Sequence, residues 1–372
     1  MNVTQHKSVL NALAYRSQTF RNRNCLDAGQ AEHLWSVDKT GTIDTSALAL
    51  CNLRDTEQQE IREINSIQVP DEILRVHGMA PPTKAEGSIR MVYENVNGFQ
   101  NKMFGNEKVD KAKDLHDELE VDIAAYCEHR LNMRHKRNQN RFSQLFKGGE
   151  AAVRSVVAHN VHENFGPVQE GGTSLLLFGP LAESLLQGGM EKDTTGLGRW
   201  VVMTLEGQGA KTRIVCGYNP CGNNKPNSGT TFQQHQRYFI TQEKKVACPR
   251  AKFREDLVAQ LKKWRAEGDR IVVCMDANED IYRKSLGKAL TDQEGLNMSE
   301  AVGDFTGKKL GATFFRGTKP IDGVWATKDI TITHACVMPA GYGMGDHRMF
   351  VVDMLEESLI GQAPFRVIRG VS

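Results

Sequence analysis

Short apolar runs rich in β-branched residues recur along most of this chain, and they constrain its fold more than any other feature. They are 89–93, 121–127, 173–179, 199–205, 212–218, 270–276, 322–327, 330–338 and 349–354. Each has the length of one strand, and β-branched side chains pack well on a pleated surface. The runs therefore predict a domain with extensive β-sheet.

Amphipathic helical patterns lie between some of these runs. Segment 107–119 is one of them. Segment 252–264 is another, with Phe253, Leu257, Leu261 and Trp264 on a single stripe. Strands mixed with helices from residue 88 to residue 356 are typical of the α/β class.

Residues 1–86 differ from the rest of the chain because they are polar and lack these runs. Only segment 55–69 has helical periodicity, with Ile61, Ile64 and Ile67 at near-helical spacing. The following stretch, HGMAPPTKAEGS, predicts a linker, since its prolines and glycines interrupt regular structure. We therefore expect a partly helical or disordered extension over 1–86, a domain over 87–356 and a tail over 357–372.

The composition is that of a globular protein without a disulfide or zinc framework. The chain is 40% hydrophobic and 25% charged, and its net charge is only +2, so basic surface must be local. The eight cysteines include no CxxC pair, which favours a reducing, intracellular compartment. No signal peptide or membrane-spanning run is evident, and we expect a monomer.

Polar residues gather where the expected strands begin or end. These residues are Asn95, Asn97, Glu128, Tyr218, Asp276, Asn278, Asp322, Asp346 and His347. Taken singly, each has an ordinary structural interpretation as a turn, a helix cap or a surface group. Taken together, they place catalytic residue types at the rigid strand termini where α/β enzymes assemble their active sites.

The chemistry that needs this set is phosphodiester hydrolysis assisted by a divalent metal. Mg²⁺ takes oxygen ligands and few carboxylates, so Glu128 is the candidate ligand, with Asn97 or Asp346 close by. Asp276 and Asn278 suit the orientation and deprotonation of water. His347, held by Asp322, suits hydrogen bonding to an oxygen that gains charge.

In its order of motifs, the chain resembles the endonuclease/exonuclease/phosphatase superfamily, which includes DNase I-like enzymes and apurinic endonucleases. The segments ATFFRGTKPIDGVWAT and GDHRMFVVDMLEESLIG are most similar to endonuclease domains of LINE-type retroelements. The resemblance implies a four-layer α/β/β/α sandwich of two packed mixed sheets. It also implies an Mg²⁺ site, with Mn²⁺ as an alternative ion, at Glu128 with support from Asn95 and Asp346. Tyr218 would contact the phosphate.

Four positions depart from the family pattern. Met275 replaces a usual glycine, Gly345 a usual serine or threonine, Asn97 an aspartate and His129 a threonine or serine. None of these changes removes a group that the mechanism requires, so the sequence favours an active enzyme.

A basic segment without acidic residues follows Glu128 and is a candidate nucleic-acid track. Its cationic residues are Arg130, Arg134, Lys136, Arg137, Arg141 and Lys147. A charge run is more often a solvated face, and the aromatic residues Phe142 and Phe146 could either stack on bases or anchor the loop.

The sequence predicts a retroelement-type endonuclease that nicks DNA, with RNA as an alternative partner and a nuclear location if the source is a eukaryotic retroelement. The alternatives are a phosphatase of the same superfamily acting on a phosphorylated lipid or nucleotide, and an inactive nucleic-acid-binding relic.

Overall fold

The computed structural model describes residues 78–99, 107–147, 152–163, 166, 168–207, 209–222, 229–242, 247–292 and 296–361, and two short strands before them. The chain divides into two units, Met1–Pro82 and Thr83–Ser372. In the first unit, β1 (Ser36–Val37) pairs antiparallel with β2 (Ile43–Asp44). The helix expected over 55–69 lies outside the described residues.

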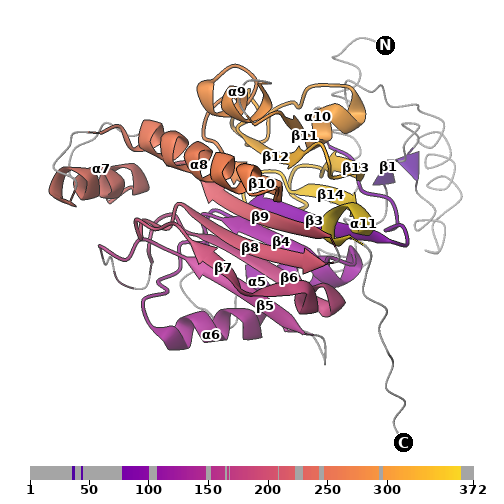
Figure 1. Ribbon diagram of the computed structural model, residues 1–372, viewed down its shortest axis with the longest axis horizontal. Helices are drawn as coiled ribbons and strands as arrows, with labels where there is room; N and C mark the ends of the chain where they lie inside the picture. Colours follow the sequence, from indigo (N-terminus) through magenta and orange to yellow (C-terminus); the bar gives the residue numbers. More distant parts are fainter. Residues whose placement is uncertain are drawn as a thin grey trace, which may run out of the picture. The chain divides into compact units, whose positions relative to one another are not determined.

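Two six-stranded sheets form the second unit (Figure 1). The first has the order β11 (Met298–Glu300), β12 (Asp322–Thr327), β10 (Arg270–Asp276), β9 (Ala210–Tyr218), β8 (Trp200–Gly207), β7 (Leu185–Lys192). The second has the order β13 (Ile332–Val337), β14 (Phe350–Leu355), β3 (Ser88–Asn95), β4 (Ile123–Cys127), β6 (Thr173–Phe178), β5 (Val153–Ala158). Both sheets are mixed, because β9 and β10 pair parallel in one and β3 and β4 in the other.

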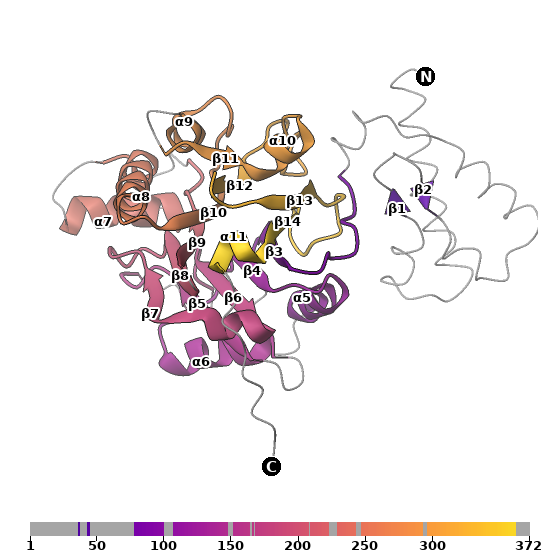
Figure 2. The ribbon, with the colours of Figure 1, turned by 45° about the vertical axis from the view of Figure 1, so that its right-hand side comes forward.

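Helices cover the outer faces of both sheets (Figures 1 and 2). On the first sheet lie α8 (Pro249–Ala266) and α9 (Ser285–Thr291), and on the second lie α5 (Glu107–Glu118) and α6 (Lys136–Leu145). The remaining helices are α7 (Thr231–Gln242), α10 (Ala301–Thr306), α11 (Glu356–Ile360) and the 3-10 helix η2 (Gly179–Ser184). The expected four-layer α/β/β/α sandwich is confirmed.

The main core lies between the two sheets. It joins side chains of the second sheet, such as Met91 and Leu175, to side chains of the first, such as Ile214 and Cys274, and all four are fully buried. Helices cover the other face of each sheet, so most strands are buried on both faces. This is why the central strands read as continuous apolar runs rather than as alternating patterns.

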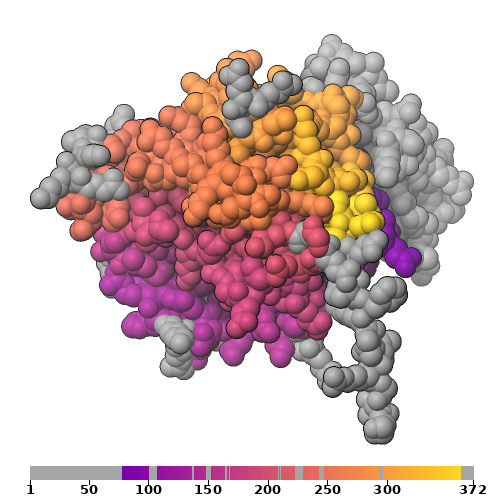
Figure 3. Space-filling model, in the orientation of Figure 1, coloured from indigo at the N-terminus to yellow at the C-terminus, as the bar shows by residue number. Residues whose placement is uncertain are grey.

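Helix α8 docks on the first sheet through the stripe that its sequence predicts. Phe253, Leu257 and Leu261 are fully buried and Trp264 is nearly so, and they share a cluster with Val273 of β10. Pro249 stands in the first turn, where its missing N–H removes no helical hydrogen bond. The opposite side of α8 forms part of the outer surface, in orange in Figure 3.

Two features differ from the sequence prediction. The first is the C-terminal boundary, because Leu359 and Ile360 of α11 are buried in the main core. Residues beyond the expected boundary at 356 therefore contribute to the core. The second is the basic segment, part of which folds as α6 and which buries Phe142 and Phe146 among aromatic side chains of the second sheet's outer face. These two rings anchor the helix and are closed to base stacking.

Among the helices that the structure describes, none is both long and apolar enough to cross a bilayer.

Glu300 should make the stability of this domain pH-dependent. Its carboxylate caps α10 by accepting from the N–H groups of Val302 and Gly303, yet burial raises its pKa from 4.5 to about 7. The folded state thus binds a proton that the unfolded state releases, so this group's contribution falls as pH rises from 4.5 to 7, by up to about 3 kcal/mol. We expect Glu300→Gln to remove this part of the pH dependence in urea unfolding between pH 4.5 and 7.5.

The matched control is Glu255→Gln, which changes an exposed glutamate of α8. An unchanged pH dependence in Glu300→Gln would contradict the assignment.

Candidate active site

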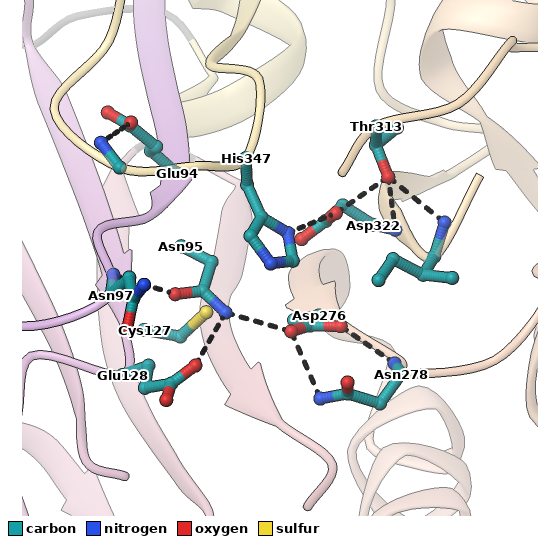
Figure 4. A network of polar contacts seen from close by, with 12 residues as sticks. Glu94, Asn95, Asn97, Cys127, Glu128, Asp276, Asn278, Thr313, Asp322 and His347 are labelled. Carbon is teal, nitrogen blue, oxygen red and sulfur yellow. Dashed lines mark hydrogen bonds and ion pairs between the residues drawn. The ribbon is translucent and has the colours of Figure 1, made fainter. Parts of the chain in front are cut away.

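Asn95 joins the two sheets at the edge where the polar strand ends meet (Figure 4). It is the last residue of β3, and its Nδ2 donates to Glu128 Oε2 at 3.0 Å and to Asp276 Oδ2 at 2.8 Å. Glu128 follows β4 in the same sheet, whereas Asp276 ends β10 in the other. One amide group therefore bridges two acidic side chains that lie far apart in the sequence.

Asp276 is held by hydrogen bonds from two elements. Besides the bond from Asn95, it accepts from the backbone N of Asn278 at 2.7 Å and from Asn278 Nδ2 at 3.0 Å. Burial raises the pKa of Asp276 well above its usual value, the charge of Asp322 adds to the rise, and His347 and the hydrogen bonds oppose it. A positioned carboxyl group with a raised pKa suits proton transfer.

His347 forms a buried pair with Asp322 (Figure 4). Its Nδ1 donates to Asp322 Oδ2 at 2.8 Å, Thr313 Oγ1 donates to the same oxygen at 2.7 Å, and Tyr93 Oη donates to Oδ1 at 3.1 Å. Burial lowers the pKa of His347, but the charge and hydrogen bond of Asp322, aided by other nearby carboxylates, outweigh it and raise the pKa to about 10. The imidazole is therefore cationic at neutral pH and can donate a proton or a hydrogen bond.

Tyr218 ends β9 beside this cluster. Burial raises its pKa well above the usual value, and the charges of Glu128 and Asp276 add to the rise. The phenol thus stays protonated as a hydrogen-bond donor. A backbone hydrogen bond holds this residue in position, because Tyr218 N donates to Arg199 O at 2.8 Å.

Asn97 and Asp346 lie at the margin of the cluster. Asn97 adopts a left-handed conformation with φ of 44°, and its backbone N donates to Asn95 Oδ1 at 2.9 Å. It therefore orients the bridging amide. Asp346 is half-buried, and its charge acts on both His347 and Lys108.

The turn after β4 holds Glu128 and Arg130 on the same side. Both residues have positive φ, 53° and 54°, a conformation that is costly for non-glycine residues and common at functional sites. Between them, buried His129 accepts from Leu131 N at 3.0 Å and contacts Ala158 O through Nε2 at 2.9 Å. His129, the departure noted in the sequence, is thus a structural anchor for this turn.

Gly172 makes room for that anchor. It has φ of 92°, and a Cβ at this position would lie 2.5 Å from the His129 ring. We expect Gly172→Ala to lower the free energy of unfolding by about 2–4 kcal/mol, from backbone strain and overpacking together. Gly268→Ala is the control, because Gly268 has φ of 87° with no atom near its Cβ position. It should cost only about 1 kcal/mol in urea unfolding, and equal losses would refute the steric argument.

The candidate ligand oxygens at and around Glu128 fit a hard divalent cation. A carboxylate has about four lone-pair positions. Here Arg130 Nη2 contacts Oε1 at 2.6 Å and Asn95 contacts Oε2, which leaves further positions open on a side chain that is 14% exposed. All candidate ligand atoms here are oxygens, the type that Mg²⁺ and Mn²⁺ prefer. Arg130 also pairs with Glu170 at 3.3 Å, so it can stay paired if a cation displaces it from Glu128.

Ligand atoms of Asp276, Asp322 and His347 also lie within 4.8 Å of one another. A metal here would have to displace the proton that Asp322 stabilises on His347. The hydrogen bond from His347 Nδ1 to Asp322 orients the ring within this trio, while Glu128 offers a partly exposed carboxylate to a cation.

The basic segment is brought only partly to the site. Arg130 lies in it, as its ion pair with Glu128 requires. Arg134 is exposed and donates from Nη2 to Val161 O at 2.8 Å. Arg141 lies half-buried on α6, which also contains Lys136 and Arg137, whose side chains are outside the described residues.

Three site residues escaped the sequence analysis. Thr313 and Tyr93 bond the carboxylate of Asp322, and Glu94 Oε1 accepts from Gly345 N at 2.6 Å, two residues before His347. For Glu94 a signal was available, because a charged residue inside an apolar strand needs a buried partner. Thr313 lies in the segment ATFFRGTKPIDGVWAT that resembles the retroelement domains, whereas Tyr93 carried no signal.

Comparison with known proteins identifies the fold. No family model matches this chain, and no curated protein matches it. Among solved structures, the AP endonuclease LMAP from Leishmania major matches with a TM-score of 0.51 and 13% identity, over 82% of this chain and 99% of that one. The Xenopus laevis APE2 catalytic domain matches with a TM-score of 0.49 and 13% identity, over 72% of this chain and 92% of that one. The human Nocturnin catalytic domain matches with a TM-score of 0.47 and 15% identity, over 73% and 96%.

Proposed function

We propose that this chain, which has the DNase I-like fold of the endonuclease/exonuclease/phosphatase superfamily, is a divalent-metal-dependent phosphodiesterase that nicks DNA. The observation that carries the proposal is the bridge from Glu128 through Asn95 to Asp276, set beside the His347–Asp322 pair. These groups provide a cation ligand, a proton acceptor and a cationic hydrogen-bond donor in one place.

Glu128 would hold Mg²⁺ or Mn²⁺, which when bound would offset negative charge on the phosphate and on the leaving oxygen. Asn95 orients Glu128, and Asp346 and Asn97, at the margin of the cluster, would support the ion or its waters. This ligand set is the part of the proposal that a soaked Mn²⁺ ion would test directly.

The remaining groups act on the phosphate and on the attacking water. Asp276, held by Asn95 and Asn278, would orient the water and accept its proton. His347, kept cationic by Asp322, would donate to an oxygen that gains charge, and the Tyr218 hydroxyl would donate to the phosphate. Each role uses a side chain whose donor or acceptor state follows from its surroundings.

DNA is the proposed substrate because Arg130 lies at the acidic cluster and further cationic residues follow it in the same segment. Arg130 reaches the site itself, and Arg134 and Arg141 lie further along the same segment. Such contacts would neutralise backbone phosphates without reading sequence. We further propose a retroelement-type endonuclease, active as a monomer inside the cell, with residues 1–86 as an N-terminal extension.

The direct test is a nicking assay on supercoiled plasmid. We expect conversion to the open circle with Mg²⁺ or Mn²⁺, no conversion with EDTA, and a rate that falls as salt rises. Release of phosphate from a phosphorylated lipid or nucleotide without nicking would assign the chain to the phosphatase alternative. Salt-dependent DNA binding with no metal-dependent reaction would identify an inactive binding protein.

A further inference from the structure

Glu94 is a fully buried acidic side chain that touches the loop carrying His347 (Figure 4). It lies in β3 between Tyr93 and Asn95, and its Oε1 accepts a hydrogen bond from Gly345 N at 2.6 Å. That loop is 251 positions away in the sequence. A buried carboxyl group is costly unless its hydrogen bonds compensate, so this contact is a specific feature of the site.

Two glycines of the loop are shaped to this contact. A Cβ on Gly343 would lie 2.4 Å from Glu94 Oε1, and a Cβ on Gly345 would lie 2.2 Å from Asn95 O. The loop therefore packs directly against the end of β3. This close approach explains why Gly345 stands where a serine or threonine is usual, because no side chain fits there.

The other end of the loop is held by α5. Lys111 Nζ donates to Gly341 O at 3.1 Å, and Tyr342 Oη donates to Glu118 Oε1 at 2.7 Å. These two contacts are exposed, whereas the Glu94 contact is part-buried and its carboxyl group is fully buried. This bond lies immediately before Asp346 and His347, at the start of the segment that enters the site.

We propose that Glu94 is a positioning residue whose carboxyl group fixes residues 343–345 and thereby aims His347 at Asp322 and Asp276. The proposal rests on the proposed function of His347. Glu94 itself touches no reacting group, and its role is exerted through the backbone of Gly345.

The test compares Glu94→Leu with Glu94→Gln. Leucine fills a similar volume but accepts no hydrogen bond, whereas glutamine keeps an oxygen acceptor for Gly345 N. We expect Glu94→Leu to lower kcat for plasmid nicking by about 10- to 100-fold, with KM for DNA changed less than about threefold. Glu94→Gln should retain at least about a third of the wild-type kcat.

A second readout does not depend on activity. The ring signals of His347, assigned in ¹H–¹³C spectra by their loss in His347→Gln, should shift in Glu94→Leu and stay near their wild-type positions in Glu94→Gln. Wild-type positions in both variants would overturn the proposal. Shifted signals in a protein that nicks no DNA would support positioning by Glu94 while refuting the proposed function.

If Glu94→Leu does not fold, Gly343→Ala supplies the perturbation from the loop side. Its Cβ would meet the Glu94 carboxyl group, so the His347 signals should shift in the same way. Gly341→Ala is the control for general strain in this loop, because its φ of 86° disfavours alanine while no atom lies within 4 Å of the Cβ position. Equal shifts in the two alanine variants would show that general loop strain is responsible and would overturn the role of Glu94.

Discussion

Replacing Glu128 with glutamine is expected to lower Mg²⁺-supported nicking by at least about a thousandfold. Glutamine keeps the size of the side chain and an oxygen acceptor for Asn95, but it removes the negative charge that binds the cation. A cation that stabilises developing phosphate charge contributes several kcal/mol, and each 1.36 kcal/mol corresponds to tenfold in rate. The loss of activity should therefore come from the missing negative charge, since the surrounding geometry is retained.

Binding of Mn²⁺ alone, followed by titration calorimetry, separates this effect from catalysis. The dissociation constant should rise at least about a hundredfold in Glu128→Gln. The matched control is Glu170→Gln, which removes the other carboxylate that pairs with Arg130 but makes no contact with Asn95 in the described structure. This partly exposed ion pair contributes little, so its loss should change the rate by at most about threefold.

Equal activity loss in the two variants would mean that Arg130, rather than a cation, is the important partner of Glu128. Retention of more than a tenth of the wild-type rate by Glu128→Gln at saturating Mg²⁺ would contradict the metal assignment. Thermal unfolding of both variants excludes a trivial loss of folded protein.

The sequence predicted the sheets well because most strands are buried on both faces. Their apolar runs are continuous, so a strand such as β10 stands out against its polar flanks. Strand β7 escaped detection for the opposite reason, since it is an edge strand with the exposed residues Gln187, Gly188 and Met190. Helix α6 was missed because its positive charges suggested a loop along a phosphate backbone.

The sequence could predict part of the site, because the catalytic residue types lie at strand ends. Hydrogen bonds and close approaches bring Asn95, Glu128, Asp276, Asp322 and His347 into one cluster, and their catalytic roles stay predictions. Their partners were not predictable, because a hydrogen bond such as that from Tyr93 to Asp322 joins residues 229 positions apart. Neither local pattern nor composition encodes such a contact, which depends on how the two sheets pack.

Arg130 shows a further limit of prediction from the sequence. The sequence placed it on a track for phosphates, and it does lie at the site, but its guanidinium pairs with the carboxylate proposed to bind metal. The left-handed conformations of Glu128 and Arg130 bring this pair together, and propensities alone would not predict two such residues in three positions.

Replacing Asp322 with asparagine is expected to lower the nicking rate by about a thousandfold and to move its pH dependence. Asp322 keeps His347 protonated, raising its pKa to about 10, and fixes the ring through Nδ1. Asparagine removes the charge, so the pKa of His347 should fall toward its ordinary value of 6.5. At neutral pH the ring would then lose both its proton and its orientation.

The sign of the pH effect follows from the raised pKa. In the wild-type protein the imidazolium is present at all pH values below about 10, so its contribution is lost only as pH rises through 10. In Asp322→Asn the alkaline limb of the kcat profile should move to lower pH, and the ¹³C titration of the His347 ring should move with it. An unchanged titration of His347 would disprove the pairing.

Thr313→Val is the control for disturbed packing, because it keeps the charge of Asp322. It removes the hydrogen bond from Thr313 to the Asp322 carboxylate and those that Thr313 accepts from the N–H groups of Ile321 and Asp322. A hydrogen bond to a charged group contributes about 1.5–3 kcal/mol, so the rate should fall by about 10- to 100-fold, which is less than in Asp322→Asn. The combined variant Asp322→Asn with His347→Gln should be little slower than His347→Gln alone, since groups that act as a unit are not additive. Additive losses would instead mean that Asp322 acts on the reaction independently of His347, through Asp276 or the protein backbone.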